Sequence, residues 1–130
     1  MDVLRMFEQE LRGSFPLTAE APGSARRWFS DQGPMPEHVR ERVMLPLSEL
    51  VANSVLHSGL GSSQEVEVSV RSIPGGLHVE VVDQGTGIDD PTPPPSGEHF
   101  GLLFVDRVSD RWGYTNRPTR VWFEILDPES

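Results

Sequence analysis

The sequence has 130 residues, no cysteine and a formal net charge of −9 at pH 7. This length fits one domain spanning residues 1–130, and the missing cysteines exclude disulfides and thiolate metal sites. The acidic balance argues against direct contact with nucleic acid or an anionic membrane surface. Because there is no signal-peptide pattern and no apolar run of about 20 residues, we expect a soluble, cytoplasmic protein.

The first part of the chain predicts a strand followed by a helix. Apolar side chains alternate over residues 11–17, and Pro16 favours a sheet edge because proline donates no ladder hydrogen bond. Ser24 is a suitable N-cap for a helix that runs to Gly33.

A longer helix is expected to begin near Pro36 and to end near His57, with Gly59 as its C-cap. Its apolar positions keep helical spacing; they are Val39, Val43, Leu47, Leu50, Val51, Ser54 and Val55. Pro46 removes one helical hydrogen bond, so we expect a kink there without a break.

The next segment predicts a β-hairpin. Valines alternate with polar residues over residues 65–71, Pro74-Gly75-Gly76 forms the turn, and the alternation returns over residues 77–81. Residues 84–100 then form a long proline-rich loop, which is typical of a lid.

A helix over residues 101–110 and a strand over residues 119–126 complete the chain. We therefore expect an α+β two-layer sandwich, in which helices cover one face of a mixed, largely antiparallel sheet.

Three features could carry chemistry. Glu49, Asn53 and His57 share one face of the long helix because they are spaced four residues apart. The sequence Asp83-Gln84-Gly85-Thr86-Gly87 follows a buried strand, and Gly101 begins a helix. Taken singly, these features also fit a solvated helix face, a simple turn and an ordinary helix start.

Their order is more specific. The segments SELVANSVLHSG, VEVVDQGTGI, FGLLFVDRVSDRWG and TRVWFEI resemble the successive motifs of the GHKL superfamily, whose fold is called the Bergerat fold. The resemblance is strongest to the stand-alone anti-sigma factor serine/threonine kinases of actinobacterial type. It implies an ATP-binding domain that uses Mg²⁺.

The resemblance assigns roles along the long helix. Asn53 matches the residue whose oxygen binds Mg²⁺, and Glu49 matches the catalytic acid that orients or deprotonates the attacking group. His57 ends the same motif and is either a nucleotide ligand or a structural cap.

The remaining roles concern the base and the phosphates. Asp83 matches the residue that accepts a hydrogen bond from the adenine amino group, and Gly85 and Gly87 allow the backbone to approach the base. Gly101 and Leu102 begin the helix whose free N–H groups face phosphate.

The lid departs from the family pattern. A second glycine and an arginine are expected just before Gly101, but His99 and Phe100 stand there, and the nearest glycine is Gly97. No arginine or lysine occurs between Gln84 and Asp106. Because phosphoryl transfer depends on stabilising spreading negative charge, we expect weak ATP affinity or slow turnover.

Two functions remain open. The first is a kinase that phosphorylates an anti-anti-sigma (STAS-type) partner and also holds a sigma factor. The second is a catalytically weak or inactive module that regulates a partner by binding. An isolated ATP domain of a split histidine kinase is less favoured, because the chain begins close to its first strand. A homodimer is possible by resemblance, with an apolar edge strand near Phe15 and the aromatic residues Trp28 and Trp112 as cues.

Overall fold

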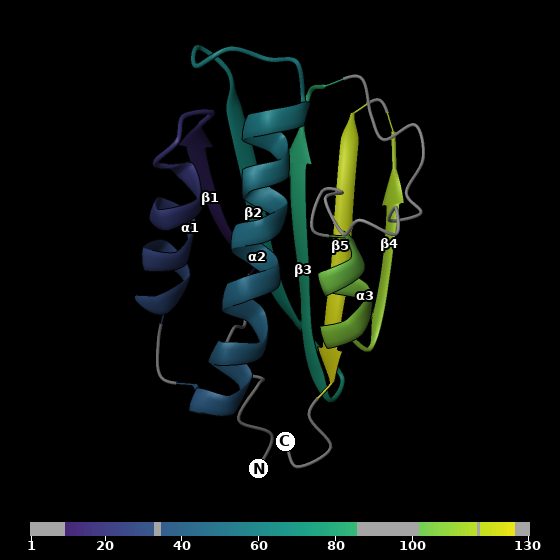
Figure 1. Cartoon of the computed structure of the whole chain (residues 1–130). Coiled ribbons are helices and arrows are strands. Elements are labelled where there is room, and N and C mark those ends of the chain that lie inside the picture. The colour runs from purple at the N-terminus through teal and green to yellow at the C-terminus, as the bar shows by residue number, and fades with distance from the viewer. Residues whose placement is uncertain (1–9, 33–34, 86–101, 117, 127–130) are drawn as a thin grey trace.

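The structure is a computed structural model that describes residues 10–32, 35–85, 102–116 and 118–126. Three helices and five strands form an α+β two-layer sandwich (Figure 1). The helices are α1 (Ala21–Ser30), α2 (Glu37–His57) and α3 (Leu102–Val108). The strands are β1 (Leu11–Pro16), β2 (Glu65–Ile73), β3 (Gly76–Asp83), β4 (Arg111–Thr115) and β5 (Thr119–Leu126).

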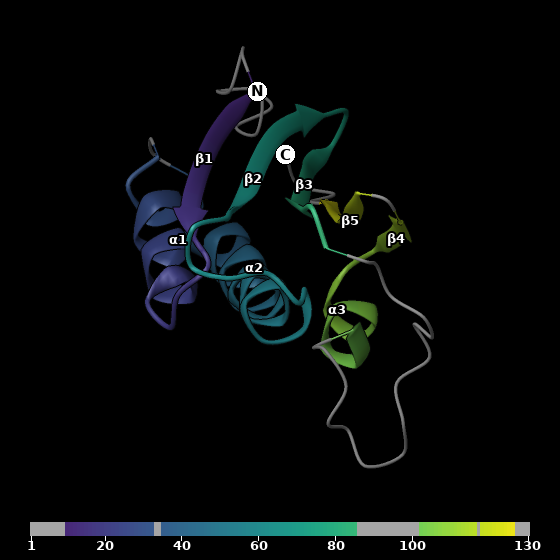
Figure 2. The same ribbon diagram turned by 90° about the horizontal axis from the view of Figure 1, so that it is seen from above.

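The strands form one sheet in the order β1-β2-β3-β5-β4, and every pairing between neighbours is antiparallel. All three helices lie on the same face of this sheet (Figure 2). Strand β1 is at an edge, as Pro16 predicted. The architecture expected from the sequence is therefore confirmed.

The core lies between the helices and the inner face of the sheet. Alternate residues of β2, β3 and β5 point inward because successive side chains of a strand face opposite sides. The largest fully buried side chains come from both layers; they include Phe29, Leu47, Leu50, Leu77, Phe123 and Ile125. Burial of one such side chain contributes about 1.5–3 kcal/mol.

Helix α2 continues through Pro46, as predicted. Two residues later, the Ser48 hydroxyl donates to the Leu45 carbonyl (3.1 Å). The helix ends at His57, and Gly59 has a φ of 77°, the left-handed conformation that glycine adopts without steric cost. The predicted end of the helix at His57 is thus confirmed, but the C-cap is Ser58, and Gly59, the expected C-cap, follows it.

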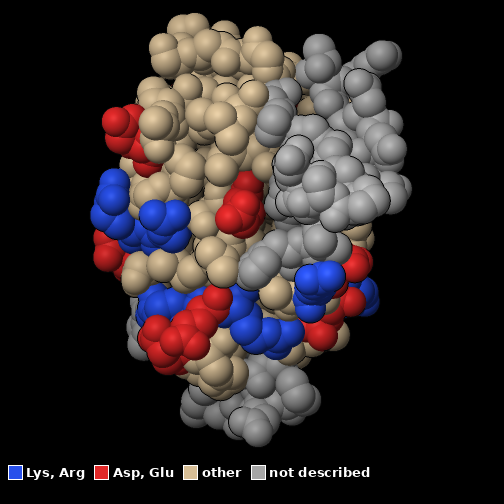
Figure 3. All heavy atoms as spheres, in the orientation of Figure 1, with Lys and Arg blue, Asp and Glu red and all other residues tan. Residues whose placement is uncertain are grey.

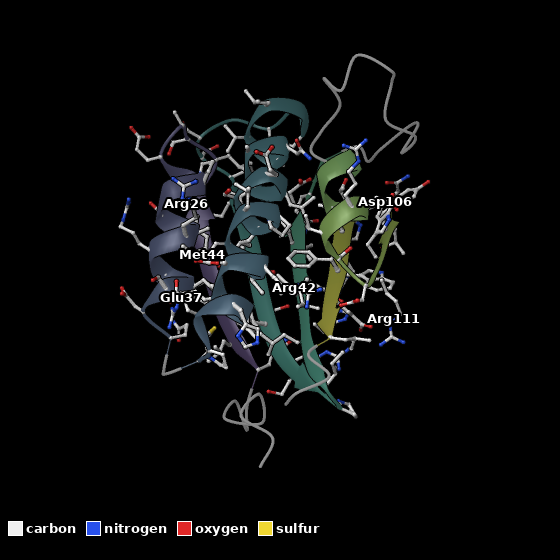
Figure 4. The ribbon with its side chains drawn as sticks, turned by 60° about the horizontal axis from the view of Figure 1, so that its bottom comes forward. Arg26, Glu37, Arg42, Met44, Asp106 and Arg111 are labelled. Atoms are coloured by element: carbon white, nitrogen blue, oxygen red, sulfur yellow. The ribbon has the colours of Figure 1, made fainter. Side chains whose placement is uncertain are left out.

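Arg42 of α2 lies on the helix-covered side of the sheet (Figure 4) and makes two contacts with distant parts of the chain. Its Nη1 donates to the Leu126 carbonyl (2.8 Å) and its Nη2 to Asp110 Oδ2 (3.0 Å). The same Asp110 oxygen accepts a hydrogen bond from the Leu126 N–H (2.6 Å). These contacts connect α2 to the end of β5 and to the residues between α3 and β4.

The predicted start of the first helix was wrong. Helix α1 begins at Ala21, and Glu20 occupies the N-cap without a side-chain hydrogen bond. Pro22 lies in the first turn, where its fixed φ fits the helix and its missing N–H costs nothing. Ser24 is inside the helix, and its hydroxyl accepts a hydrogen bond from Arg27 Nη2 (3.2 Å).

Strand β4 was not predicted, since the sequence between the last helix and the last strand was left without an element. Trp112 and Tyr114 alternate there and pack against the core. Gly113 interrupts the pattern for a steric reason: a Cβ at this position would lie 2.7 Å from Cζ2 of Trp122 on β5. The glycine lets that indole lie against β4.

The two tryptophans that served as cues for a homodimer pack within the chain, and the homodimer stays a prediction. Trp28 and Trp112 are both half-buried and pack against the core. Trp28 also makes an edge-to-face contact with Phe15, with ring centroids 6.0 Å apart. Both tryptophans therefore have a role within one copy of the chain.

Candidate active site

The candidate site lies where the C-terminal half of α2 meets the end of β3 (Figure 1). Asp83 is the last residue of β3, and only 4% of it is exposed. Its Oδ2 accepts a hydrogen bond from the Ser54 hydroxyl on α2 (2.6 Å). Its Oδ1 accepts one from the Gly85 N–H (2.7 Å). The tertiary fold thus brings together a carboxylate and a helix that lie 29 residues apart in the sequence.

The structure describes the side chains of two of the three site residues predicted on the long helix. Glu49 and Asn53 are both half-buried on α2, and Asn53 directly precedes Ser54. Glu49 is the acidic residue in the second half of this helix. Figure 3 shows an acidic group over the middle of α2, and the described residues next to it are largely uncharged. His57 is the last residue of α2, but its side chain lies outside the described part of the structure.

Gly85 is buried in the site, and the protein itself explains why it is glycine. A Cβ there would lie 2.6 Å from the Ser58 carbonyl oxygen and 2.8 Å from Asp83 Oδ1. The residue is therefore small because the end of α2 comes close to it. The sequence had suggested only that a base approaches the backbone here.

The lid predictions lie largely outside the described residues. Gly87, Gly97 and Gly101 all fall within residues 86–101, which the structure does not describe. Leu102 begins α3, as expected, but its side chain is not described. The roles in nucleotide binding expected for these residues stay predictions.

Sequence reasoning missed two polar residues of the site. Ser54 was counted with the apolar face of the long helix, and it is indeed buried, with 6% exposed. Thr119, the first residue of β5, is also buried, and its hydroxyl lies 3.4 Å from the Gly85 carbonyl oxygen. A serine within an apolar helix face was the available indication, because buried hydroxyl groups need a hydrogen-bond partner.

The sequence profile of the histidine kinase-like ATPase domain matches residues 15–125. The chain belongs to the histidine kinase-like ATPase family. Membership of an ATPase domain family implies nucleotide binding. Among curated proteins, none matches the sequence significantly.

A solved structure shows the same fold. The crystal structure of the RsbU and RsbW domains of Rv1364c from Mycobacterium tuberculosis superimposes with a TM-score of 0.71 at 15% sequence identity. The match covers 91% of the histidine kinase-like chain but 32% of the other chain. At this identity the likeness shows a shared fold, and the chain spans about a third of the length of the structure it matches.

The outer face of the sheet carries a second polar cluster. His78 is buried between two carboxylates, with Nδ1 2.7 Å from Glu124 Oε2 and Nε2 2.9 Å from Glu80 Oε1. Arg120 pairs with Glu80 (2.7 Å), and Trp122 stacks on the His78 ring with centroids 5.4 Å apart. Burial alone raises the pKa of Glu80, but hydrogen bonds from His78 and Arg120 outweigh it and lower the pKa overall.

This outer cluster is separate from the candidate site. Two cavities of about 170 and 260 Å³ lie on the same outer side, and residues such as Ser14, Glu67 and Val82 line both. None of the predicted site residues lines either cavity.

In the described part of the chain, no helix is long and apolar enough to cross a membrane.

Proposed function

We propose that this domain binds ATP with Mg²⁺ beside α2 and transfers the γ-phosphoryl group to a hydroxyl of a regulatory partner protein. The observation that carries the proposal is the buried Asp83 carboxylate, which is held by Ser54 and Gly85 next to Asn53. A buried carboxylate of this kind is a specific hydrogen-bond acceptor. Because the chain belongs to an ATPase domain family, we take a nucleotide as the ligand of this carboxylate.

The donor set fits an adenine nucleotide. Both groups that contact the Asp83 oxygens in the described residues are donors, and an ionised carboxylate offers about four acceptor positions. Acceptor capacity therefore remains for the adenine amino group. Guanine carries a carbonyl oxygen at that position, and two acceptors facing each other are unfavourable.

Asn53 fits Mg²⁺, although the ion has few protein ligands available here. The described residues contain no cluster of three or more His, Cys, Asp or Glu side chains that could hold a metal. Mg²⁺ at nucleotide sites needs only one or two protein oxygens, because phosphates and water complete its coordination. When bound, the ion would neutralise phosphate charge, and the side-chain oxygen of Asn53 on α2 is its proposed protein ligand.

Glu49 is the proposed catalytic base. It lies one helical turn before Asn53, and its carboxylate is half-buried and therefore partly accessible. A carboxylate next to the phosphate site can accept the proton of an attacking serine or threonine hydroxyl. By likeness to the anti-sigma factor kinases, we propose an anti-anti-sigma protein of STAS type as the substrate and a sigma factor as a second partner.

Calorimetric titration with ATP and ADP, each with and without Mg²⁺, tests the binding part of this proposal. We expect micromolar or weaker binding of both nucleotides, with ATP affinity raised by Mg²⁺. Asn53→Ala should remove the Mg²⁺ dependence, while His38→Ala, a change on the exposed N-terminal part of the same helix, should leave it unchanged. If the wild-type domain binds neither nucleotide, the proposed function is wrong.

Phosphoryl transfer to STAS-domain proteins of the same genome tests the catalytic part. Glu49→Gln should abolish transfer and leave nucleotide affinity within about twofold, because it removes a proton acceptor and keeps the side-chain shape. Glu41→Gln, two turns earlier on α2 and exposed, is the matched control. Loss of nucleotide binding in Glu49→Gln would assign Glu49 a structural role instead.

A binding module without phosphoryl transfer is the second candidate function. The absence of arginine and lysine between Gln84 and Asp106 favours it, because that segment has no permanently positive side chain to offset phosphate charge. This candidate predicts that partner binding survives Asn53→Ala and requires no ATP. A partner interaction that disappears with Asn53→Ala would count against it.

A further inference from the structure

The Asp83 carboxylate is held from two directions. The Gly85 N–H reaches Oδ1 from the chain just after β3, and the Ser54 hydroxyl reaches Oδ2 from α2. The side chain is almost fully buried. The Gly85 contact comes from a residue only two positions away, whereas the Ser54 contact depends on how α2 packs against the sheet.

The two hydrogen bonds constrain the orientation of the Asp83 carboxylate to different degrees. The terminal torsion of an aspartate has a broad energy minimum, so the carboxylate plane is not fixed by its own covalent geometry. One donor at Oδ1 leaves the plane free to turn about that contact. The second donor at Oδ2 fixes the plane, and it therefore fixes the directions of the lone pairs that neither donor uses.

We infer that Ser54 is a positioning residue for base recognition in this chain. Its hydroxyl orients the Asp83 carboxylate so that an unused lone pair meets the exocyclic 6-amino group of an adenine nucleotide. This inference rests on the proposed function, because it takes Asp83 as the acceptor for adenine. It adds that Ser54 strengthens binding only when the ligand carries that amino group.

A purely structural role makes a different prediction. If Ser54 served only to satisfy a buried carboxylate, its removal would weaken the fold or the site for every ligand equally. A pair of ligands that differ only in the amino group separates the two roles. These are ADP and purine riboside 5′-diphosphate, which has hydrogen in place of the 6-amino group.

The test measures the calorimetric affinity of both ligands, with Mg²⁺ present, for the full chain and three variants. Ser54→Ala removes the donor, and Ser54→Thr keeps a hydroxyl. Ser48→Ala is the matched control, because Ser48 is a buried serine on the same helix whose hydroxyl bonds the Leu45 carbonyl and not Asp83. Far-UV circular dichroism confirms that each variant is folded.

We expect Ser54→Ala to bind ADP about tenfold more weakly than wild type, which is the lower end of what loss of a hydrogen bond to a charged group costs. Its affinity for the analogue should change less than twofold. Ser54→Thr should recover at least part of the ADP affinity, and Ser48→Ala should match wild type for both ligands.

Other outcomes overturn the inference. An equal loss for both ligands assigns Ser54 a structural role, and unchanged ADP affinity in Ser54→Ala shows that the carboxylate needs no second donor. If Ser54→Ala does not fold, Ser54→Thr provides the test. The inference is overturned if Ser54→Thr lacks the preference for ADP over the analogue that wild type shows. If wild type binds neither ligand, the proposed function fails as well, so the two failures are distinguishable.

Discussion

Gly85→Ala is the substitution whose effect follows most directly from the structure. The added Cβ would lie 2.6 Å from the Ser58 carbonyl oxygen, 3.0 Å from Ser58 Cα and 2.8 Å from Asp83 Oδ1. Ser58 is the C-cap of α2, and its backbone N–H donates to the Ser54 carbonyl. The Ser58 carbonyl oxygen therefore belongs to a fixed part of the fold. Gly85 is not among the glycines with positive φ, so the penalty is steric and not conformational.

The size of the penalty can be estimated. Overpacking of a buried position costs about 1–3 kcal/mol. The entropy of unfolding is about 2.1 cal/mol/K per residue, which gives about 0.27 kcal/mol/K for 130 residues. Gly85→Ala should therefore lower Tm by roughly 4–11 °C.

The same substitution should also weaken ADP binding. To relieve the clash, the chain at Gly85 must move by several tenths of an ångström away from α2. That movement lengthens the hydrogen bond from the Gly85 N–H to Asp83, on which the carboxylate position depends. We expect ADP affinity to fall by about tenfold, in line with the loss of one charge-assisted hydrogen bond.

Thermal unfolding followed by circular dichroism, together with ADP calorimetry, gives both readouts. Gly61→Ala is the control, because Gly61 is exposed and its added Cβ would have no atom within 4 Å. Its Tm and affinity should match wild type. A Gly85→Ala variant that melts within 1 °C of wild type and binds ADP normally would refute the steric reasoning.

Three further predictions concern stability. Folding lowers the pKa of Glu80, so the contribution of this residue to the free energy of unfolding is present above the unfolded-state pKa of about 4.3 and is lost as pH falls through the lower folded pKa. Urea unfolding between pH 6 and pH 3 should therefore show a smaller acid-induced loss of stability in Glu80→Gln than in wild type. Leu47→Ala should cost about 2–5 kcal/mol in urea unfolding because Leu47 is fully buried, whereas Leu56→Ala on the same helix should stay within about 0.5 kcal/mol because Leu56 is 72% exposed; similar costs at both positions would contradict the packing of α2. Arg42→Ala should lower the free energy of unfolding by about 1 kcal/mol, since its contacts are partly exposed, and high salt should narrow the difference from wild type.

Much of the candidate site could be anticipated from the order of motifs along the chain. Asn53 on a long helix and Asp83 at the end of a strand are local features, and the structure places them as expected. Ser54 and Thr119 were not anticipated, because their importance depends on what they contact. Both contacts join segments that are about 30 residues apart in the sequence.

The start of α1 and strand β4 were missed for local reasons. A capping serine was available at Ser24, and only the first-turn proline indicated that the N-cap is Glu20, four residues earlier. In β4, a glycine and the short length concealed the alternation of Trp112 and Tyr114. The glycine is explained by the Trp122 indole of the neighbouring strand, which the local sequence does not reveal.

The sequence by itself determined the hairpin, the long helix, the last strand and the α+β class. Hydrophobic periodicity encodes these elements, because each must bury one face. Only the tertiary structure decided that Ser54 meets Asp83, that Gly85 lies against the end of α2, and that β4 pairs with β5. Such contacts depend on register and on the packing of distant segments, which no local pattern specifies.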